Sequence, residues 1–199
     1  MSALSRITLV FIVLLLAASV AAADFEKGVA AYDRGDYATA LREWRPLAKQ
    51  GDAIAQFNLG TLYNKGRGVP QDFKKAVKWY RKAAEQGDAK AQYNLGIIYD
   101  NGQDVPQDYE EAAKWYRKAA EQGDVRAQYN LGVMYGQGHG VLLNYIKAHM
   151  WFNLAAANGH KLAIKGKDIA ANILSSADVS KAQAMAREWI KKFEERKRK

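Results

Sequence analysis

Histidine and cysteine are the side chains that most often hold catalytic metals, and this chain contains few of them. It has three histidines, His139, His149 and His160, and no cysteine. No two histidines stand four residues apart, and a zinc site without cysteine needs a cluster of histidine or carboxylate ligands. His149 and His160 lie on or just beyond one predicted helix, so a metal site that uses both of them is left as an alternative. We expect histidines that pack or face solvent, with no metal and no cofactor.

Nucleophilic catalysis and phosphate binding find no better support. Beyond residue 23 the only serines are Ser175, Ser176 and Ser180, and none lies in S-x-x-K or G-x-S-x-G. The glycine-rich segment 136–140 lacks the Lys-Ser/Thr pair of a phosphate-binding loop and does not follow a predicted strand. We therefore expect no catalytic residue and predict that the protein is not an enzyme.

The charge balance is basic, with a formal net charge of +9. Such a balance suits nucleic acid, an anionic membrane surface or an acidic protein equally well. The densest cluster is the tail Arg196–Lys199, which is either a solvated helix end or a weak contact for an acidic partner or anionic lipid. Base-stacking aromatics are not interleaved with these cations, so we expect no nucleic-acid partner.

The first 23 residues have the pattern of a signal peptide. Arg6 precedes the apolar run Ile7–Ala18, and the small residues Ala21–Ala23 follow it. The run is shorter than the ~20 residues that span a bilayer as a helix. We predict cleavage before Asp24 and a periplasmic or secreted protein, with an uncleaved membrane anchor as the alternative.

A 36-residue period organises the rest of the chain. Residues 69–104 and 105–140 align without a gap, and 24 of the 36 positions are identical. Three motifs recur at this 36-residue spacing: Gly-Asp at 51, 87 and 123, Asn-Leu-Gly at 58, 94 and 130, and tryptophan at 79, 115 and 151. Repetition at this period is typical of stacked helical repeats.

Each unit is predicted to form two helices. Within 89–99 the apolar Ala91, Leu95 and Ile98 share one helical face. A turn with Pro106 follows, and a second amphipathic helix is predicted for 109–122. A recurring glycine inside the first helix (Gly60, Gly96, Gly132) predicts a close helix crossing, with a neighbouring backbone in the space of the missing side chain.

The recurring motifs resemble the Sel1-like repeat, a relative of the tetratricopeptide repeat. The pattern A-x-A-Q-[FY]-N-L-G-x-x-Y occurs at 53–63 and 89–99, and its A-Q-Y-N-L-G core recurs from Ala127. The motifs G-x-x-V-P-Q-D and A-x-x-W-[YF]-x-x-A-A-x-x-G follow in register, but segment 141–144 replaces V-P-Q-D in the third turn. The resemblance implies an all-α fold, an α/α solenoid of about ten helices wound as a right-handed superhelix.

The predicted domains follow from the repeats. After the signal peptide (1–23) come an N-terminal helical pair that caps the array (24–50) and three repeats within 51–160, at about 53–88, 89–124 and 125–160. Residues 161–199 are predicted to be capping helices with a basic tail. Ser175 and Asp178 fit a capping box at the start of the last helix, which we expect to cover the exposed face of the last repeat.

The resemblance also implies a binding surface, because first helices line the concave side of tetratricopeptide-like arrays. The positions carried across by register are Ile54, Phe57, Thr61 and Asn64, then Lys90, Tyr93, Ile97 and Asp100, then Arg126, Tyr129, Val133 and Gln137. They form a stripe distinct from the core stripe. Phe57, Tyr93 and Tyr129 could instead be packing residues between successive units.

The function implied by the resemblance is that of an exported adaptor or scaffold. It would bind a protein or peptide partner in its concave groove and regulate an envelope sensor or envelope assembly. Two alternatives stay open at this point. One is a cell-envelope hydrolase of the β-lactamase-like kind described for some Sel1-like proteins, and the other is a binder of envelope polysaccharide through the exposed aromatics.

Overall fold

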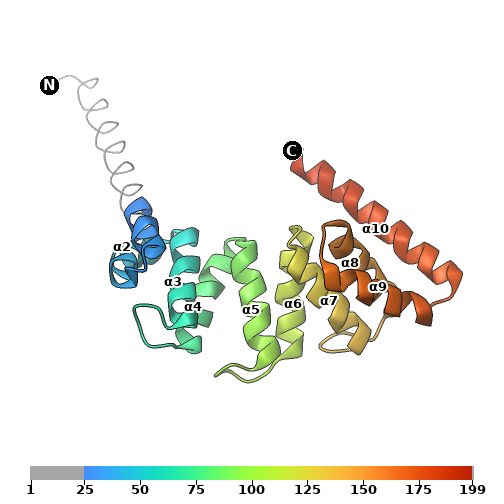
Figure 1. Cartoon of the computed structure of the whole chain (residues 1–199), viewed down its shortest axis with the longest axis horizontal. Helices are drawn as coiled ribbons and strands as arrows, with labels where there is room; N and C mark the ends of the chain where they lie inside the picture. The colour runs from blue at the N-terminus through green and yellow to red at the C-terminus, as the bar shows by residue number, and fades with distance from the viewer. Residues whose placement is uncertain (1–24, 199) are drawn as a thin grey trace, which may run out of the picture. The chain divides into compact units, whose positions relative to one another are not determined.

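The computed structural model describes residues 25–198, and every regular element in that range is a helix (Figure 1). Residues 25–33 are helical, and nine further helices follow, α2 to α10. The predicted all-α fold of about ten helices is therefore confirmed. The predicted signal peptide and its cleavage site lie outside the described residues. Between residues 25 and 198 no helix is long and apolar enough to cross a membrane.

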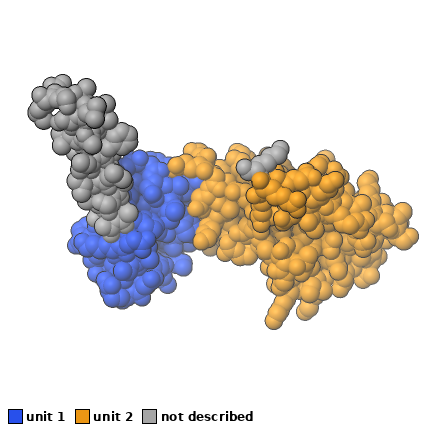
Figure 2. All heavy atoms as spheres, turned by 90° about the horizontal axis from the view of Figure 1, so that it is seen from above, with its two compact units in different colours: residues 1–83 blue, residues 84–199 orange. Residues whose placement is uncertain are grey.

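The chain divides into two compact units, residues 1–83 and 84–199 (Figure 2). The first unit contains the helix 25–33, α2 (Tyr37–Gln50), α3 (Ala53–Lys65) and α4 (Phe73–Glu85), which ends just past the boundary. Those of the second unit are α5 (Ala89–Asn101), α6 (Tyr109–Glu121), α7 (Val125–Gln137), α8 (Tyr145–Ala157), α9 (Lys161–Ile173) and α10 (Ser176–Lys197).

The repeated Gly-Asp pairs start the first helix of each repeat. The carboxylates of Asp52, Asp88 and Asp124 accept hydrogen bonds from backbone N–H groups three residues on, which satisfies donors that a helix start leaves unpaired. The same helices end at glycines with left-handed backbone, for example Gly102 at φ 66°. Helix boundaries are thus set by local residues that recur every 36 positions.

The recurring glycine inside each first helix lies against an aromatic ring of the second helix. A Cβ on Gly60 would come within 2.6 Å of the Tyr80 ring, and one on Gly132 within 2.7 Å of the Phe152 ring. Gly96 faces Tyr116 in the same way. The predicted close crossing is present, but the space is filled by a ring and not by a neighbouring backbone.

A buried glutamine joins each repeat to the helix before it. The amide Nε2 of Gln56 donates to the carbonyl of Ala48 at 3.0 Å, and Gln92 donates to the carbonyl of Ala84 at the same distance. Gln128 repeats the bond to Ala120. Each of these carbonyls lies in the last turn of a helix and also accepts from the backbone N–H of the following glycine, Gly51, Gly87 or Gly123. The glutamine thus adds a buried side-chain bond at each helix end.

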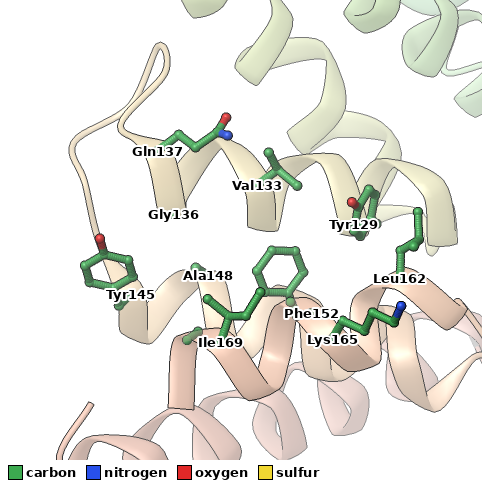
Figure 3. Close-up of a pocket in the computed structure, with 12 residues that line it drawn as sticks. Tyr129, Val133, Gly136, Gln137, Tyr145, Ala148, Phe152, Leu162, Lys165 and Ile169 are labelled. Atoms are coloured by element: carbon green, nitrogen blue, oxygen red, sulfur yellow. The ribbon is translucent and has the colours of Figure 1, made fainter. Parts of the chain in front are cut away.

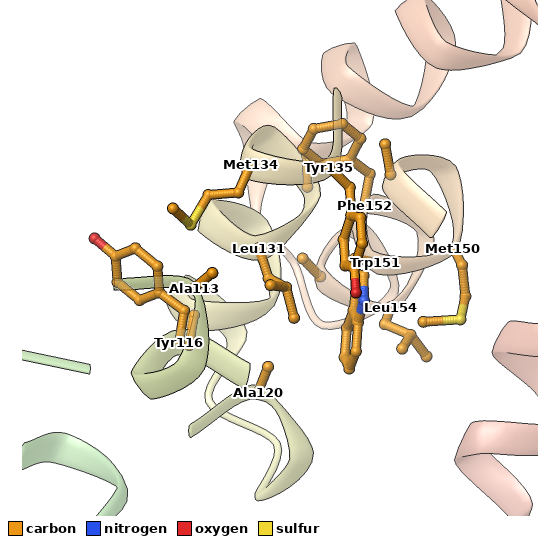
Figure 4. Packing of buried hydrophobic residues seen from close by; sticks show 14 of the residues in the cluster. Ala113, Tyr116, Ala120, Leu131, Met134, Tyr135, Met150, Trp151, Phe152 and Leu154 are labelled. Atoms are coloured by element: carbon orange, nitrogen blue, oxygen red, sulfur yellow. The ribbon is translucent and has the colours of Figure 1, made fainter. Parts of the chain in front are cut away.

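The core of the second unit lies between α6, α7 and α8 (Figure 4). Leu131, Met134, Trp151, Phe152 and Leu154 are all buried there. The predicted core stripe on α5 is buried as well, at Ala91, Leu95 and Ile98. A smaller core in the first unit gathers around Trp44, Leu59 and Leu62.

The last two helices depart from the repeat. α10 packs against α8, with the Trp189 ring 6.1 Å from Trp151. Ser175 caps it as predicted, accepting from the backbone N–H of Asp178 at 3.1 Å. α10 therefore lies against the last repeat, as expected, but it leaves α9 uncovered, and Leu162, Ile164, Ile169 and Ile173 of α9 are 47–63% exposed.

The reason lies in two substitutions within the repeat register. The α9 residue that matches Gly60 and Gly132 in the 36-residue register is Asp168. The α10 residue that matches the aromatic rings of the second helices, such as Phe152, is Glu188. In the repeats, the second helix packs on the first through the glycine–ring contact. That contact cannot form between α9 and α10. Instead, α10 packs on α8 through its own Trp189.

Candidate functional site

An open groove of about 340 Å³ runs between α7 and α9, with α8 as its floor (Figure 3). The α8 residues that face it include Ala148 and the ring of Phe152. Gly132 of α7 and Gly166 of α9 both approach that ring, with positions for a Cβ 2.7 and 2.9 Å away. The missing side chains let the two helices come close to the ring, and the groove opens above it.

The α7 wall carries three of the predicted partner-binding residues. Tyr129, Val133 and Gln137 follow one another at intervals of four residues, so they share one face of the helix. The Tyr129 ring lies 5.8 Å from Phe152 and stacks on the imidazole of His160 at 4.4 Å. Tyr129 is thus held in place on two sides while it faces the groove.

Gln137 stands one position beyond the register of Asn64 and Asp100. The true counterpart in α7 is Gly136, and both Gly136 and Gln137 line the groove. Gln137 is exposed, so its amide is available at the end of this wall.

The α9 wall was missed by the sequence analysis. Leu162, Lys165 and Ile169 line the groove, and they lie 36 residues after Arg126, Tyr129 and Val133. One further step of the same register would have found them. The repeat is hard to recognise beyond residue 160 because α9 lacks the Q-[FY]-N-L-G motif.

The predicted binding residues of the first unit are placed differently. Ile54 is 55% exposed. Phe57 packs its ring 5.8 Å from Tyr80, and the Thr61 hydroxyl accepts from Tyr80 at 3.2 Å and donates to the carbonyl of Phe57. The carbonyl of Asn64 accepts from the Gln71 amide. These contacts hold α3 and α4 together.

The predicted residues of α5 are also largely engaged within the second unit. Tyr93 packs against Tyr116 and lies under the guanidinium of Arg126, 4.1 Å from its ring centre. Burial raises the pKa of the Tyr93 hydroxyl above its usual value. Arg126 also forms a salt bridge with Asp124 at 2.8 Å.

The other α5 positions vary in exposure. Asp100 accepts a hydrogen bond from the Tyr116 hydroxyl at 3.2 Å, Ile97 packs against the core, and Lys90 is exposed. Packing accounts for the repeated aromatics Phe57 and Tyr93, whereas Tyr129 both packs and lines the groove.

The histidines take part in packing. His139 stacks on Tyr109 at 4.5 Å. His149 is 2% exposed, and burial together with the charge of Lys167 lowers the pKa of its imidazole. Within residues 25–198 no three His, Asp or Glu side chains are placed to hold a metal ion together.

The groove has one charged side chain, Lys165, among the residues that line it. Across residues 25–198 no carboxylate forms an ion pair with its ammonium group. The turn that joins α7 to α8 exposes Leu142 at 90% and Leu143 at 55%, so the segment that departs from V-P-Q-D is not packed. The site therefore combines an apolar surface with a single positive charge.

The comparison with protein families matches the Sel1 repeat to residues 53–88, 89–124 and 125–160. The chain belongs to the Sel1 repeat family. Among solved structures, a Sel1 repeat protein from Oxalobacter formigenes is 38% identical, with a TM-score of 0.69, over 73% of this chain and 60% of that one. This chain therefore spans less than two thirds of that relative's length.

Two other solved structures resemble the present chain. The protective antigen c5321 of uropathogenic Escherichia coli is 31% identical over 87% of this chain and 46% of its own, with a TM-score of 0.53. Cysteine-rich protein B of Helicobacter pylori is 25% identical over 64% and 95%, with a TM-score of 0.52. The comparison with curated proteins finds no match. The solenoid fold is confirmed, and Sel1 repeat proteins are in general scaffolds that bind other proteins.

Proposed function

We propose that this Sel1 repeat protein is an exported adaptor that holds a protein or peptide partner in the α7–α9 groove. The partner would be a component of an envelope sensor or of envelope assembly. The observation that carries the proposal is the groove itself, which is open, mostly apolar and lined by Tyr129, Val133, Leu162 and Ile169.

Large exposed apolar side chains gather around this groove. Leu142 and Leu143 lie in the turn between two lining residues, Gln137 and Tyr145, and Leu162 and Ile169 lie on the α9 wall. Soluble proteins seldom leave such side chains grouped at a surface unless another molecule covers them. Aromatic and apolar anchors in a pocket also supply most of the binding energy at protein interfaces.

Export is the part of the proposal that depends on sequence alone. Residues 1–23 have the charge, apolar run and small-residue site of a signal peptide. A weaker contact of the tail Arg196–Lys199 with acidic protein groups or anionic lipid belongs to the same proposal. The Arg196 guanidinium donates to the carbonyl of Glu121 at 3.3 Å, which anchors the start of that tail.

Two isoleucines of α9 provide a matched test. Ile169 is 63% exposed and lines the groove, while Ile164 is 47% exposed and does not. We expect Ile169→Asp to abolish capture of the specific partner from an envelope extract, because a carboxylate would enter an apolar contact. Ile164→Asp should leave capture unchanged.

Capture is measured by mass spectrometry of proteins retained by the tagged mature chain, with helicity and thermal unfolding followed by circular dichroism. Both variants should unfold at the wild-type temperature, since both side chains are exposed. Equal retention of the same partner by wild type and Ile169→Asp would show that the groove is not the binding site.

A further inference from the structure

We propose that the α7–α9 groove receives an amphipathic helix of the partner, with large apolar side chains on one face and a carboxylate beside them. The inference depends on the proposed function, since it names the kind of segment that the groove binds. It follows from the shape of the groove, from the apolar surface beyond one of its ends and from its charge.

The shape suits a helix. The α7 wall presents Tyr129, Val133 and Gln137 over eight residues, a rise of about 12 Å, and the α9 wall presents Leu162, Lys165 and Ile169 over a similar length. Figure 3 shows these two rows on opposite sides of Phe152. Rows of side chains with helical spacing accept the ridge of a third helix, as in helix-in-groove recognition.

Apolar surface continues past one end of the cavity, the end where Gln137, Tyr145 and Ile169 lie (Figure 3). The turn between Gln137 and Tyr145 exposes Leu142 and Leu143, and on the α9 wall Ile173 follows Ile169 by one turn and is 53% exposed. These side chains come from the two segments that depart from the repeat, the third turn and α9. An occupant longer than the cavity, with apolar residues over two to three turns, would cover them.

Charge selects the kind of helix. Lys165 is the charged side chain among the lining residues, and the ion pairs formed within 25–198 do not include it. Asp168, the carboxylate on α9, is exposed but is not among the lining residues. A carboxylate of the partner placed beside the apolar contacts would pair with Lys165, whereas a cationic helix would meet repulsion.

A second copy of this chain fits the groove poorly. Its own exposed apolar helix, α9, carries Lys161, Lys165 and Lys167 against the single Asp168. Docking α9 into the same groove of another copy would bring like charges together around Lys165. The complementary charge points to a different, acidic protein.

The test uses two synthetic peptides of identical helical design. Both carry leucines at i, i+4 and i+7, and they differ only in whether the flanking positions are Glu or Lys. Fluorescence anisotropy with the mature chain should give a Kd at least about tenfold lower for the Glu peptide than for the Lys peptide. Lys165→Glu should reverse that preference, and Lys181→Glu, an exposed lysine of α10, should leave it unchanged.

Several outcomes would overturn the inference. They are binding of neither peptide below ~1 mM, equal affinity for both, and a preference that Lys165→Glu does not alter. Oleate that competes with the Glu peptide at equal affinity would assign the groove to lipid, and a dimer dissociated by Ile169→Asp in sedimentation would assign it to a second copy. If Ile169→Asp still abolishes partner capture while the peptides show no charge preference, the groove remains the binding site and only the acidic helix is wrong.

Discussion

At the scale of single residues, each helix pair packs through a glycine of one helix against an aromatic ring of the other. Gly28 faces Trp44, Gly60 faces Tyr80, and Gly132 faces Phe152, so the ring changes while the glycine does not. In each pair the ring occupies the volume that a Cβ would need. Glycine costs conformational entropy in a helix, and the burial of the aromatic ring against it offsets that cost.

Two glycines of α7 give opposite predictions for the same substitution. Gly132→Ala should lower the free energy of unfolding by about 1–3 kcal/mol, because its Cβ would lie 2.7 Å from the Phe152 ring. Gly136→Ala should raise it by about 0.5–1 kcal/mol, because its Cβ would meet only Ala148 at 3.8 Å, and alanine favours the helix. Urea unfolding measures both, and changes of the same sign would contradict the glycine–ring account.

At the scale of elements, α9 and α10 show how an array can end without repeating itself. α9 keeps the small residues that face α8, Ala163, Gly166 and Ala170, but it has lost the glycine that would seat a second helix. α10 therefore packs on α8 through Trp189 against Trp151, and its Phe193 lies near Gly123 in the turn between α6 and α7. The apolar side of α9 stays exposed and becomes a wall of the groove.

Trp189 should carry most of the attachment of α10. Trp189→Ala should cost about 2 kcal/mol of stability, because the half-buried indole packs on Trp151 and stacks on Phe193 at 4.8 Å. Ile190→Ala is the neighbouring control, since Ile190 is 43% exposed and should change stability by less than about 0.5 kcal/mol. Hydrogen exchange of α10 amides should rise in the first variant, and equal exchange in both would show that α10 is held elsewhere.

At the scale of the whole molecule, stability should depend on pH through the buried His149. Burial lowers the pKa of its imidazole in the folded chain below the ordinary value of 6.5. Above that pH the side chain is neutral in both states, so its contribution is constant. As pH falls below about 6.5, the unfolded chain binds a proton that the folded chain does not, and stability declines by at most about 1.4 kcal/mol per pH unit.

Urea unfolding between pH 7.5 and 5.5 measures this effect. The carboxyl groups whose pKa is lowered by hydrogen bonds to neighbouring residues, such as Asp72 and Glu43, titrate in a more acidic range and do not contribute there. His149→Gln should flatten the profile, whereas His139→Gln should retain it. A slope that His149→Gln leaves intact would assign the pH dependence to other groups.

The sequence alone determined the helices and their caps, the faces they bury and the family to which they belong. These features depend on neighbouring residues, and the same Gly-Asp, Asn-Leu-Gly and aromatic positions return every 36 residues. Periodicity therefore predicted the core stripe of Ala91, Leu95 and Ile98, and it predicted a close crossing at each recurring glycine. It could not say that a ring fills that crossing, because the partner atom lies on another helix.

Tertiary structure decided where the molecule can bind. The groove needs Tyr129 and Val133 of α7, Phe152 of α8, and Leu162 and Ile169 of α9 to meet, and α9 had no motif by which the repeat could be recognised. Whether α10 covers α9 depends on the sum of packing at Asp168, Glu188 and Trp189, residues that are distant or unlike their counterparts in the repeat. Burial is a property of assembled surfaces, so the exposed wall of the groove appears only when all the helices are in place.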